Sequence, residues 1–143
     1  MDDDIATLAR SRFGVVVSLL QPGEQVELGL EREGEACARY NIDFRSLPVA
    51  DRCAPGETAE FIESVHQLAI LLRHGANVAI HCRQSIGRAG LLAVSLALSL
   101  GVPLEAGLAI VSRARGLRVP ETQEQERWLR SNAAHLSALR SDD

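Results

Sequence analysis

The chain has 143 residues, which is enough for one domain with a sizeable core and too few for two. An apolar content of 46% is ordinary for a globular protein and excludes the collagen-like, coiled-coil and disordered classes. The 15 basic residues against 19 acidic ones give a net charge of −4, which argues against a general nucleic-acid binder. Every basic residue is Arg, so a site for an anion must be built from Arg and backbone groups.

The sequence also carries expectations about compartment and cofactors. The longest apolar run, 89–100, is shorter than the roughly 20 residues that cross a bilayer. The chain starts with an acidic segment, 2–4, whereas a signal peptide starts with a cationic one. Three Cys without metal-ligand spacing favour a reducing compartment. We therefore expect a cytoplasmic protein with no membrane span, no metal and no cofactor.

In chain order, periodicity and turn residues predict a short helix at 5–12, a buried strand at 15–20, a polar and largely helical stretch at 24–40, and a strand at 42–49. A loop at 50–57 follows. The next helix is expected to begin with Thr58 as its N-cap and to end at Gly75.

The second half of the chain begins with a buried strand at 77–80 that leads directly into His81 and Cys82. Further helices are expected at 87–100, 103–115 and 122–139, the first of them apolar nearly all round. Strands separated by helices imply a mainly parallel central sheet covered by helices on both faces. The fold class is therefore α/β, in a single domain over 1–143.

The segment 78–90 carries the chemistry. It places Cys82 at the end of a buried strand and Arg88 six residues later, with a helix beginning between them. Five intervening residues can wrap around the sulfur with their N–H groups inward, and such a nest at a helix N-terminus binds a doubly charged oxyanion. Arg88 would complete the ring, because its planar fork can bind two phosphate oxygens. Cysteine thiolates are favoured at such positions, so Cys82 is the candidate nucleophile.

The run His81-Cys82-x5-Arg88 resembles the His-Cys-x5-Arg signature of the cysteine-dependent protein tyrosine and dual-specificity phosphatases, in particular their small bacterial members. The resemblance extends over roughly 15–129. It implies that a phosphatase-type phosphate-binding loop lies between a central strand and a helix and that His81 orients this loop. The implied phosphate-binding residues are Arg83, Gln84, Ser85, Ile86, Gly87 and Arg88.

The resemblance also assigns residues outside the loop. It points to Asp51 as the general acid, whereas the residue types alone also allow an Asp that turns the chain before Pro55. Asp43 is the competing carboxylate. The resemblance places Gln125 where a Gln positions the hydrolytic water, but Thr122 and Gln125 also form a capping-box pattern, and both interpretations stay open.

Two loop positions depart from the family's pattern. Ser85 stands where Gly is usual, and Ala89 stands where a Ser or Thr normally follows the Arg. That hydroxyl donates a hydrogen bond to the departing sulfur, so we expect the phosphocysteine of this chain to break down slowly.

The expected function is hydrolysis of phosphotyrosine, with phosphoserine and phosphothreonine as a wider range, through a cysteinyl-phosphate intermediate. The expected partners are a phosphorylated protein substrate and a phosphate or other oxyanion in the site, and not nucleic acid. Two alternatives stay open: a phosphoinositide or other small-molecule phosphatase, and a weakly active module that binds phosphoproteins. Arg83 is the one additional cation in the loop, which disfavours the lipid substrate.

Overall fold

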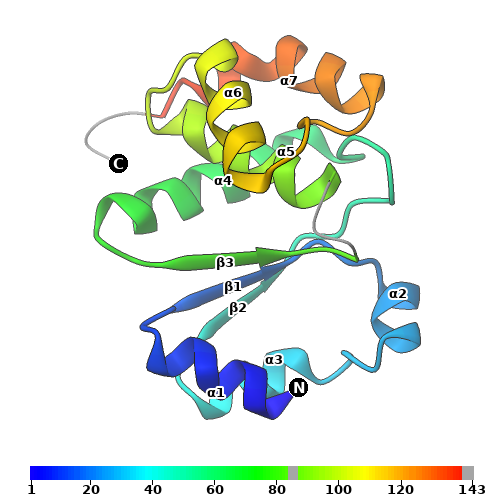
Figure 1. The fold of residues 1–143 in the computed structure, drawn as a ribbon, viewed down its shortest axis with the longest axis vertical. Helices are drawn as coiled ribbons and strands as arrows, with labels where there is room; N and C mark the ends of the chain where they lie inside the picture. Colours follow the sequence, from blue (N-terminus) through cyan, green and yellow to red (C-terminus); the bar gives the residue numbers. More distant parts are fainter. Residues whose placement is uncertain (84–86, 140–143) are drawn as a thin grey trace.

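The computed structural model describes residues 1–83 and 87–139. These residues form a three-stranded parallel sheet with strand order β2-β1-β3 (Figure 1). The central strand is β1 (Val15–Ser18), flanked by β2 (Asp43–Ser46) and β3 (Val78–His81). Val15 is aligned with Asp43 on one side and with Val78 on the other, so the three carboxyl ends lie at one edge of the sheet.

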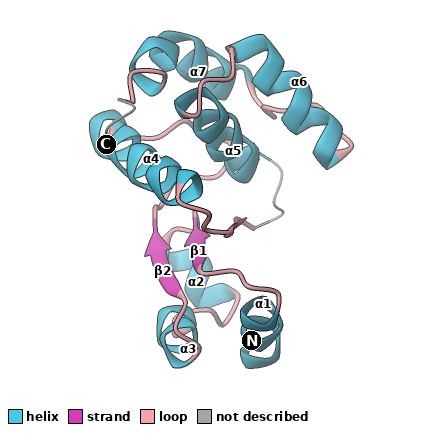
Figure 2. Cartoon of the chain, turned by 90° about the vertical axis from the view of Figure 1, so that its left-hand side faces the viewer, coloured by secondary structure: helices cyan, strands magenta, loops and turns pink. Residues whose placement is uncertain are grey.

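Helices cover both faces of this sheet (Figures 1 and 2). One face carries α1 (Asp2–Arg10) and α3 (Glu33–Arg39). The other face carries α4 (Thr58–Arg73), α5 (Gly87–Ser99), α6 (Leu104–Arg115) and α7 (Gln123–Leu136). The short helix α2 (Pro22–Glu27) lies beyond the carboxyl end of β1. The predicted α/β class with a parallel, two-sided sheet is confirmed.

Alternation along β1 divides the core in two. Val15 and Val17 belong to the larger cluster, with side chains of α4, α5 and α7, whereas Val16 belongs to a smaller cluster under α1 and α3. All four β1 residues are buried, and complete burial of a Val stabilises the fold by roughly 1.5–3 kcal/mol. Cys37 is fully buried in the smaller cluster, and this burial raises the pKa of its thiol to about 11. Cys37 is a packing residue.

The stretch 24–40, predicted to be largely helical, holds two helices, α2 and α3. Just after the end of α2, Gly29 has a left-handed φ of 68°, and Leu30 donates its N–H to the carbonyl of Gln25. This pair of features is the glycine C-cap that stops a helix. The expectation of a buried, central strand before Cys82 was wrong: among the described residues β3 is an edge strand, and its four residues are only half-buried. An apolar run of four residues does not show whether a strand lies at the centre or at the edge of a sheet.

Element boundaries moved by a few residues. Glu57, not Thr58, is the N-cap of α4, and the Thr58 hydroxyl instead accepts a hydrogen bond from Trp128 Nε1 at 3.2 Å. β2 is shorter than expected and ends before Pro48, which has no N–H to donate to a ladder. Within the described part of the chain, no helix is both long and apolar enough to cross a membrane.

Candidate active site

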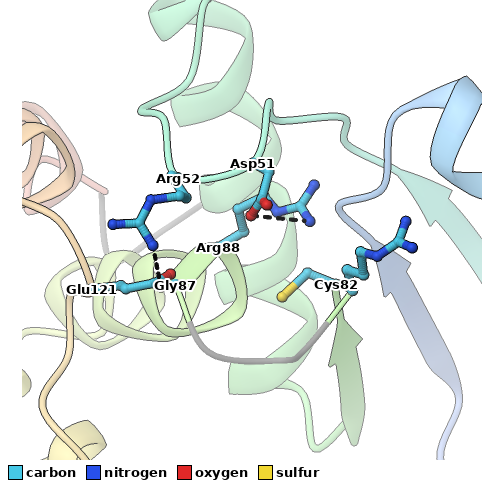
Figure 3. A pocket seen from close by; sticks show the side chains of 7 residues that line it. Asp51, Arg52, Cys82, Gly87, Arg88 and Glu121 are labelled. Carbon is cyan, nitrogen blue, oxygen red and sulfur yellow. Dashed lines mark hydrogen bonds and ion pairs between the residues drawn. The ribbon is translucent and has the colours of Figure 1, made fainter.

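A pocket of about 180 Å³ lies where β3 ends and α5 begins (Figure 3). Its lining residues come from three parts of the chain: Asp51, Arg52, Cys82, Arg83, Gly87, Arg88 and Glu121. Cys82 directly follows β3, is 8% exposed, and points its sulfur into this space. Of the predicted phosphate-binding residues, Arg83, Gly87 and Arg88 line the pocket, while Gln84, Ser85 and Ile86 lie outside the described residues.

The guanidinium of Arg88 donates hydrogen bonds to a backbone carbonyl and to a carboxylate. Its side chain is 2% exposed, and Nη1 donates to the carbonyl of Val49 at 2.9 Å and to Glu24 Oε1 at 2.7 Å. Nη2 donates to the second Glu24 oxygen, Oε2, at 2.9 Å, so the pair is bidentate. A buried guanidinium is stable only when its charge is paired and its donors are occupied. Glu24 therefore fixes Arg88 at the pocket.

The pKa of the Glu24 carboxylate reflects this pairing. The hydrogen bond from Arg88 lowers the pKa of Glu24 below its ordinary value of 4.5, against the opposing effect of burial. The same contact raises the pKa of Arg88. Glu24 also accepts the backbone N–H of Gln21 in the capping box of α2, so the helix start itself aims the carboxylate. Sequence reasoning missed Glu24, because its only local signal is that capping pattern.

Asp51 lies opposite Cys82 on the loop after β2. Its carboxylate is exposed, and Oδ1 lies 3.6 Å from Arg88 Nη2 (Figure 3). Asp51 thus shares one pocket with Cys82 and Arg88, as the sequence predicts. Asp43, the competing carboxylate, lies within β2 and pairs with Arg45 at 3.0 Å, and it does not line this pocket.

His81 is the last residue of β3, one position before the nucleophile. Its Nε2 lies 2.7 Å from Oε2 of Glu33, which is 5% exposed, but the contact is too poorly aligned for a hydrogen bond. The other Glu33 oxygen, Oε1, has no partner among the described residues. The contact is an ion pair when the imidazole is protonated. The polar sequence around Glu33 gives no local pattern from which this contact with His81 could be predicted.

The predicted capping box at α7 is present. Thr122 is the N-cap and accepts the N–H of Gln125, while Gln125 Oε1 accepts the N–H of Thr122 at 3.3 Å. Gln125 is fully buried, and its Nε2 donates to the carbonyl of Cys53 at 3.2 Å. The helix-initiating interpretation of this pattern is confirmed, and the amide also reaches the Asp51 loop.

The site is rich in paired charge. Arg52 pairs with Glu121 at 2.8 Å, both in the pocket lining, and Arg83, also in the lining, pairs with Glu27 at 2.8 Å. Within residues 1–83 and 87–139, no group of three or more His, Cys, Asp and Glu side chains is arranged to hold a metal ion. A cysteine at a strand end, a helix N-terminus and a buried Arg are together suited to holding a phosphate dianion beside a sulfur nucleophile.

Known proteins share this fold. A family model described as "Polymorphic toxin system, DSP-PTPase phosphatase" matches residues 1–102. The crystal structure of Tk-PTP in its active form is similar with a TM-score of 0.79 at 27% identity, covering 94% of this chain and 86% of that one. Kinase associated phosphatase, with its catalytic cysteine changed to serine, gives a TM-score of 0.83 at 21% identity and coverage of 96% and 78%.

TpbA of P. aeruginosa, in complex with phosphotyrosine, gives a TM-score of 0.63 at 22% identity, covering 95% of this chain and 78% of that one. No protein of curated function matches the chain. Because the family model covers well over half of the sequence, the chain belongs to the DSP-PTPase phosphatase family that the model describes. It is a phosphatase of the protein-tyrosine and dual-specificity type.

Proposed function

We propose that this phosphatase removes phosphate from phosphotyrosine in proteins, with phosphoserine and phosphothreonine as a wider range. The observation that carries the proposal is the gathering of Cys82, Arg88 and Asp51 in one pocket, with the Asp51 carboxylate 3.6 Å from the guanidinium. The complex of TpbA with phosphotyrosine supports this substrate class. The pairing of Arg83 with Glu27 leaves less free positive charge for a phosphoinositide headgroup.

In the first step, the Cys82 thiolate attacks phosphorus and the bond to the tyrosine oxygen breaks. Asp51 gives its proton to that leaving oxygen, so tyrosine departs neutral. The N–H groups of the 83–88 loop and the guanidinium of Arg88 stabilise the equatorial phosphoryl oxygens. His81, through its contact with Glu33, orients the strand end that carries the nucleophile.

In the second step, water attacks the phosphocysteine. Asp51, now ionised, accepts a proton from the water, the sulfur–phosphorus bond breaks, and the thiolate returns as inorganic phosphate leaves. Gln125 is the residue that the resemblance places beside this water, although its amide is occupied in the structure by Cys53 and Thr122.

The direct test is hydrolysis of an aryl phosphate in the presence of EDTA by the wild type and by Cys82→Ser. We expect turnover by the wild type and none by Cys82→Ser, which should still bind an oxyanion such as tungstate because the loop is retained. Cys37→Ala is the matched control, since Cys37 is a buried residue of α3 and does not line the pocket. A Cys82→Ser variant with the wild-type rate contradicts the proposal, and tungstate binding without any wild-type turnover favours the binding-module alternative.

A further inference from the structure

The loop that carries Asp51 is joined to the start of α7 by an ion pair and several hydrogen bonds. Each residue from Arg52 to Ala54 makes a direct contact with the segment 121–125, which we call the α7 clamp. Arg52 Nη1 pairs with Glu121 at 2.8 Å, and the Arg52 carbonyl accepts from the hydroxyl of Thr122 at 3.1 Å. The Cys53 carbonyl accepts from Gln125 Nε2, and the Ala54 N–H donates to Glu124 Oε2 at 2.7 Å.

The two ends of the Gln125 amide are both occupied. Its Nε2 donates to Cys53 in the loop and its Oε1 accepts from Thr122 in the clamp, while the side chain is fully buried. An amide that is hydrogen-bonded at both ends and closed off from solvent fixes its partners relative to each other. Gln125 therefore joins the acid loop to the helix start.

The backbone of the loop gives a reason for such fastening. Arg52 has a φ of 65°, a left-handed conformation that is unfavourable for a residue with a side chain. Such conformations cost about 1–3 kcal/mol and persist only where the surroundings determine them. Contacts on both sides of this turn, from Arg52 itself and from Cys53, hold it, and Asp51 is the residue immediately before it.

We infer that the α7 clamp positions Asp51 for proton transfer and that Glu124 and Gln125 are its positioning residues. The inference rests on the proposed function, in which Asp51 protonates the leaving oxygen. General acid catalysis depends on placement within hydrogen-bond reach, and a displacement of 1 Å can cost about 100-fold in rate. The clamp holds the exposed Asp51 carboxylate opposite Cys82 before substrate arrives.

This role and a water-positioning role for Gln125 predict losses in different steps. In kcat/KM, which covers the steps up to departure of the leaving group, a residue that positions Asp51 matters only when that group needs a proton. A residue that positions water affects breakdown of the phosphocysteine, which is the same for every substrate. The dependence on the leaving group therefore separates the two assignments.

Glu124 offers the cleanest variant, because it is exposed and its removal leaves the core intact. We expect Glu124→Ala to lower kcat/KM about 10- to 100-fold for phenyl phosphate, a poor leaving group, and less than about twofold for 2,4-dinitrophenyl phosphate. Glu124→Gln should restore most of the loss, since an amide oxygen can still accept from Ala54. Glu126→Ala is the matched control: it removes a Glu two residues along α7 that pairs with Arg118 instead.

Gln125→Ala should show the same dependence on the leaving group, and neither variant should add to the loss of Asp51→Asn in a double mutant. Equal losses on both substrates, losses additive with Asp51→Asn, or a change confined to phosphocysteine breakdown would overturn the inference. Failure of the proposed function looks different, because Cys82→Ser would then match the wild type and Asp51→Asn would have no effect. If Gln125→Ala does not fold, the comparison of Glu124→Ala with Glu124→Gln is sufficient to test the inference.

Discussion

At the scale of single residues, the site depends on carboxylates that do three different jobs. Glu24 fixes the buried Arg88, Glu33 faces His81, and Asp51 is the one of these three that is exposed at the pocket. An exposed carboxylate beside a guanidinium can exchange a proton with substrate and water, whereas the partly buried Glu24 is committed to its bidentate ion pair. This difference in surroundings favours Asp51 as the general acid of the proposed mechanism.

Asp51→Asn tests that assignment against Asp43→Asn. We expect Asp51→Asn to lose about 10²–10⁴-fold in kcat/KM on phenyl phosphate, because the amide has no proton to give, and far less in kcat/KM on a leaving group that needs none. Asp43 pairs with Arg45 on β2, so Asp43→Asn should leave both rates unchanged. The rates of both variants on the two substrates are the measurement, and a large loss in Asp43→Asn would move the acid role to that residue.

Ala89, in the first turn of α5 and 2% exposed, gives a second prediction at this scale. A hydroxyl there would stabilise the sulfur as it leaves the phosphocysteine, and a hydrogen bond to a charged group contributes roughly 1.5–3 kcal/mol. Its absence should slow the second step about tenfold to a hundredfold. Stopped-flow hydrolysis should therefore show a burst in the wild type, which Ala89→Ser shrinks while raising the steady rate. A wild type without a burst, together with an unchanged Ala89→Ser rate, would refute this account.

At the scale of elements, α5 packs closely against the segment before α7, and Gly90 is the residue of α5 at the contact. A Cβ at Gly90 would lie 2.7 Å from Cγ1 of Val119, which is itself 3% exposed and has no room to move. Gly90 thus allows the segment before α7 to lie directly against α5. The close approach keeps Glu121, at the pocket, within reach of Arg52.

Two glycine substitutions distinguish the effect of this close packing on stability from the effect of helix propensity. Gly90→Ala should destabilise the protein by about 1–3 kcal/mol through overpacking, despite the better helix propensity of Ala. Gly107→Ala in α6 should stabilise it by up to about 1 kcal/mol, because the new methyl would meet Ala97 at an ordinary 3.6 Å. Urea unfolding of both variants gives the comparison, and a stabilised Gly90→Ala would contradict the packing described.

The elements also show what a sequence can and cannot predict. The strand that ends before Cys82 and the helix that begins at Gly87 are local features, so apolar runs and turn residues predict their positions. The Thr122–Gln125 cap is local as well and was predicted. Glu24 and Glu33 act through partners far along the chain, and nothing near them in sequence marks those contacts. Long-range pairing follows from topology, and the strand order was not predicted from the sequence.

At the scale of the whole molecule, the ion pair between Glu24 and Arg88 links stability to pH. The folded-state pKa of Glu24 lies below its unfolded value of 4.5, so the unfolded chain binds more protons in the acid range. The stabilisation is therefore complete above pH 4.5 and is lost as the pH falls through the folded-state pKa. The charges that face Glu24 are Arg88 and, at longer range, Arg83.

Glu24→Gln should consequently be less stable than the wild type at pH 7, by about 1–3 kcal/mol. The gap should close as the pH falls from 4.5 through the folded-state pKa of Glu24, because the folded wild-type carboxylate then becomes protonated too. Urea unfolding midpoints of both proteins between pH 7 and pH 3 supply the measurement. A gap that stays constant over this range would mean that Glu24 stabilises the fold by packing and not by charge.

The central claim is that Cys82 carries the phosphoryl group between substrate and water. Asp51→Asn with 2,4-dinitrophenyl phosphate tests it most directly, because that leaving group needs no acid while breakdown of the intermediate lacks its base. After an acid quench, peptide mass spectrometry should find a phosphoryl group on Cys82 in near-stoichiometric amount, and none in the Cys82→Ser, Asp51→Asn double variant. Release of dinitrophenol with no phosphoryl group on Cys82 would contradict the mechanism.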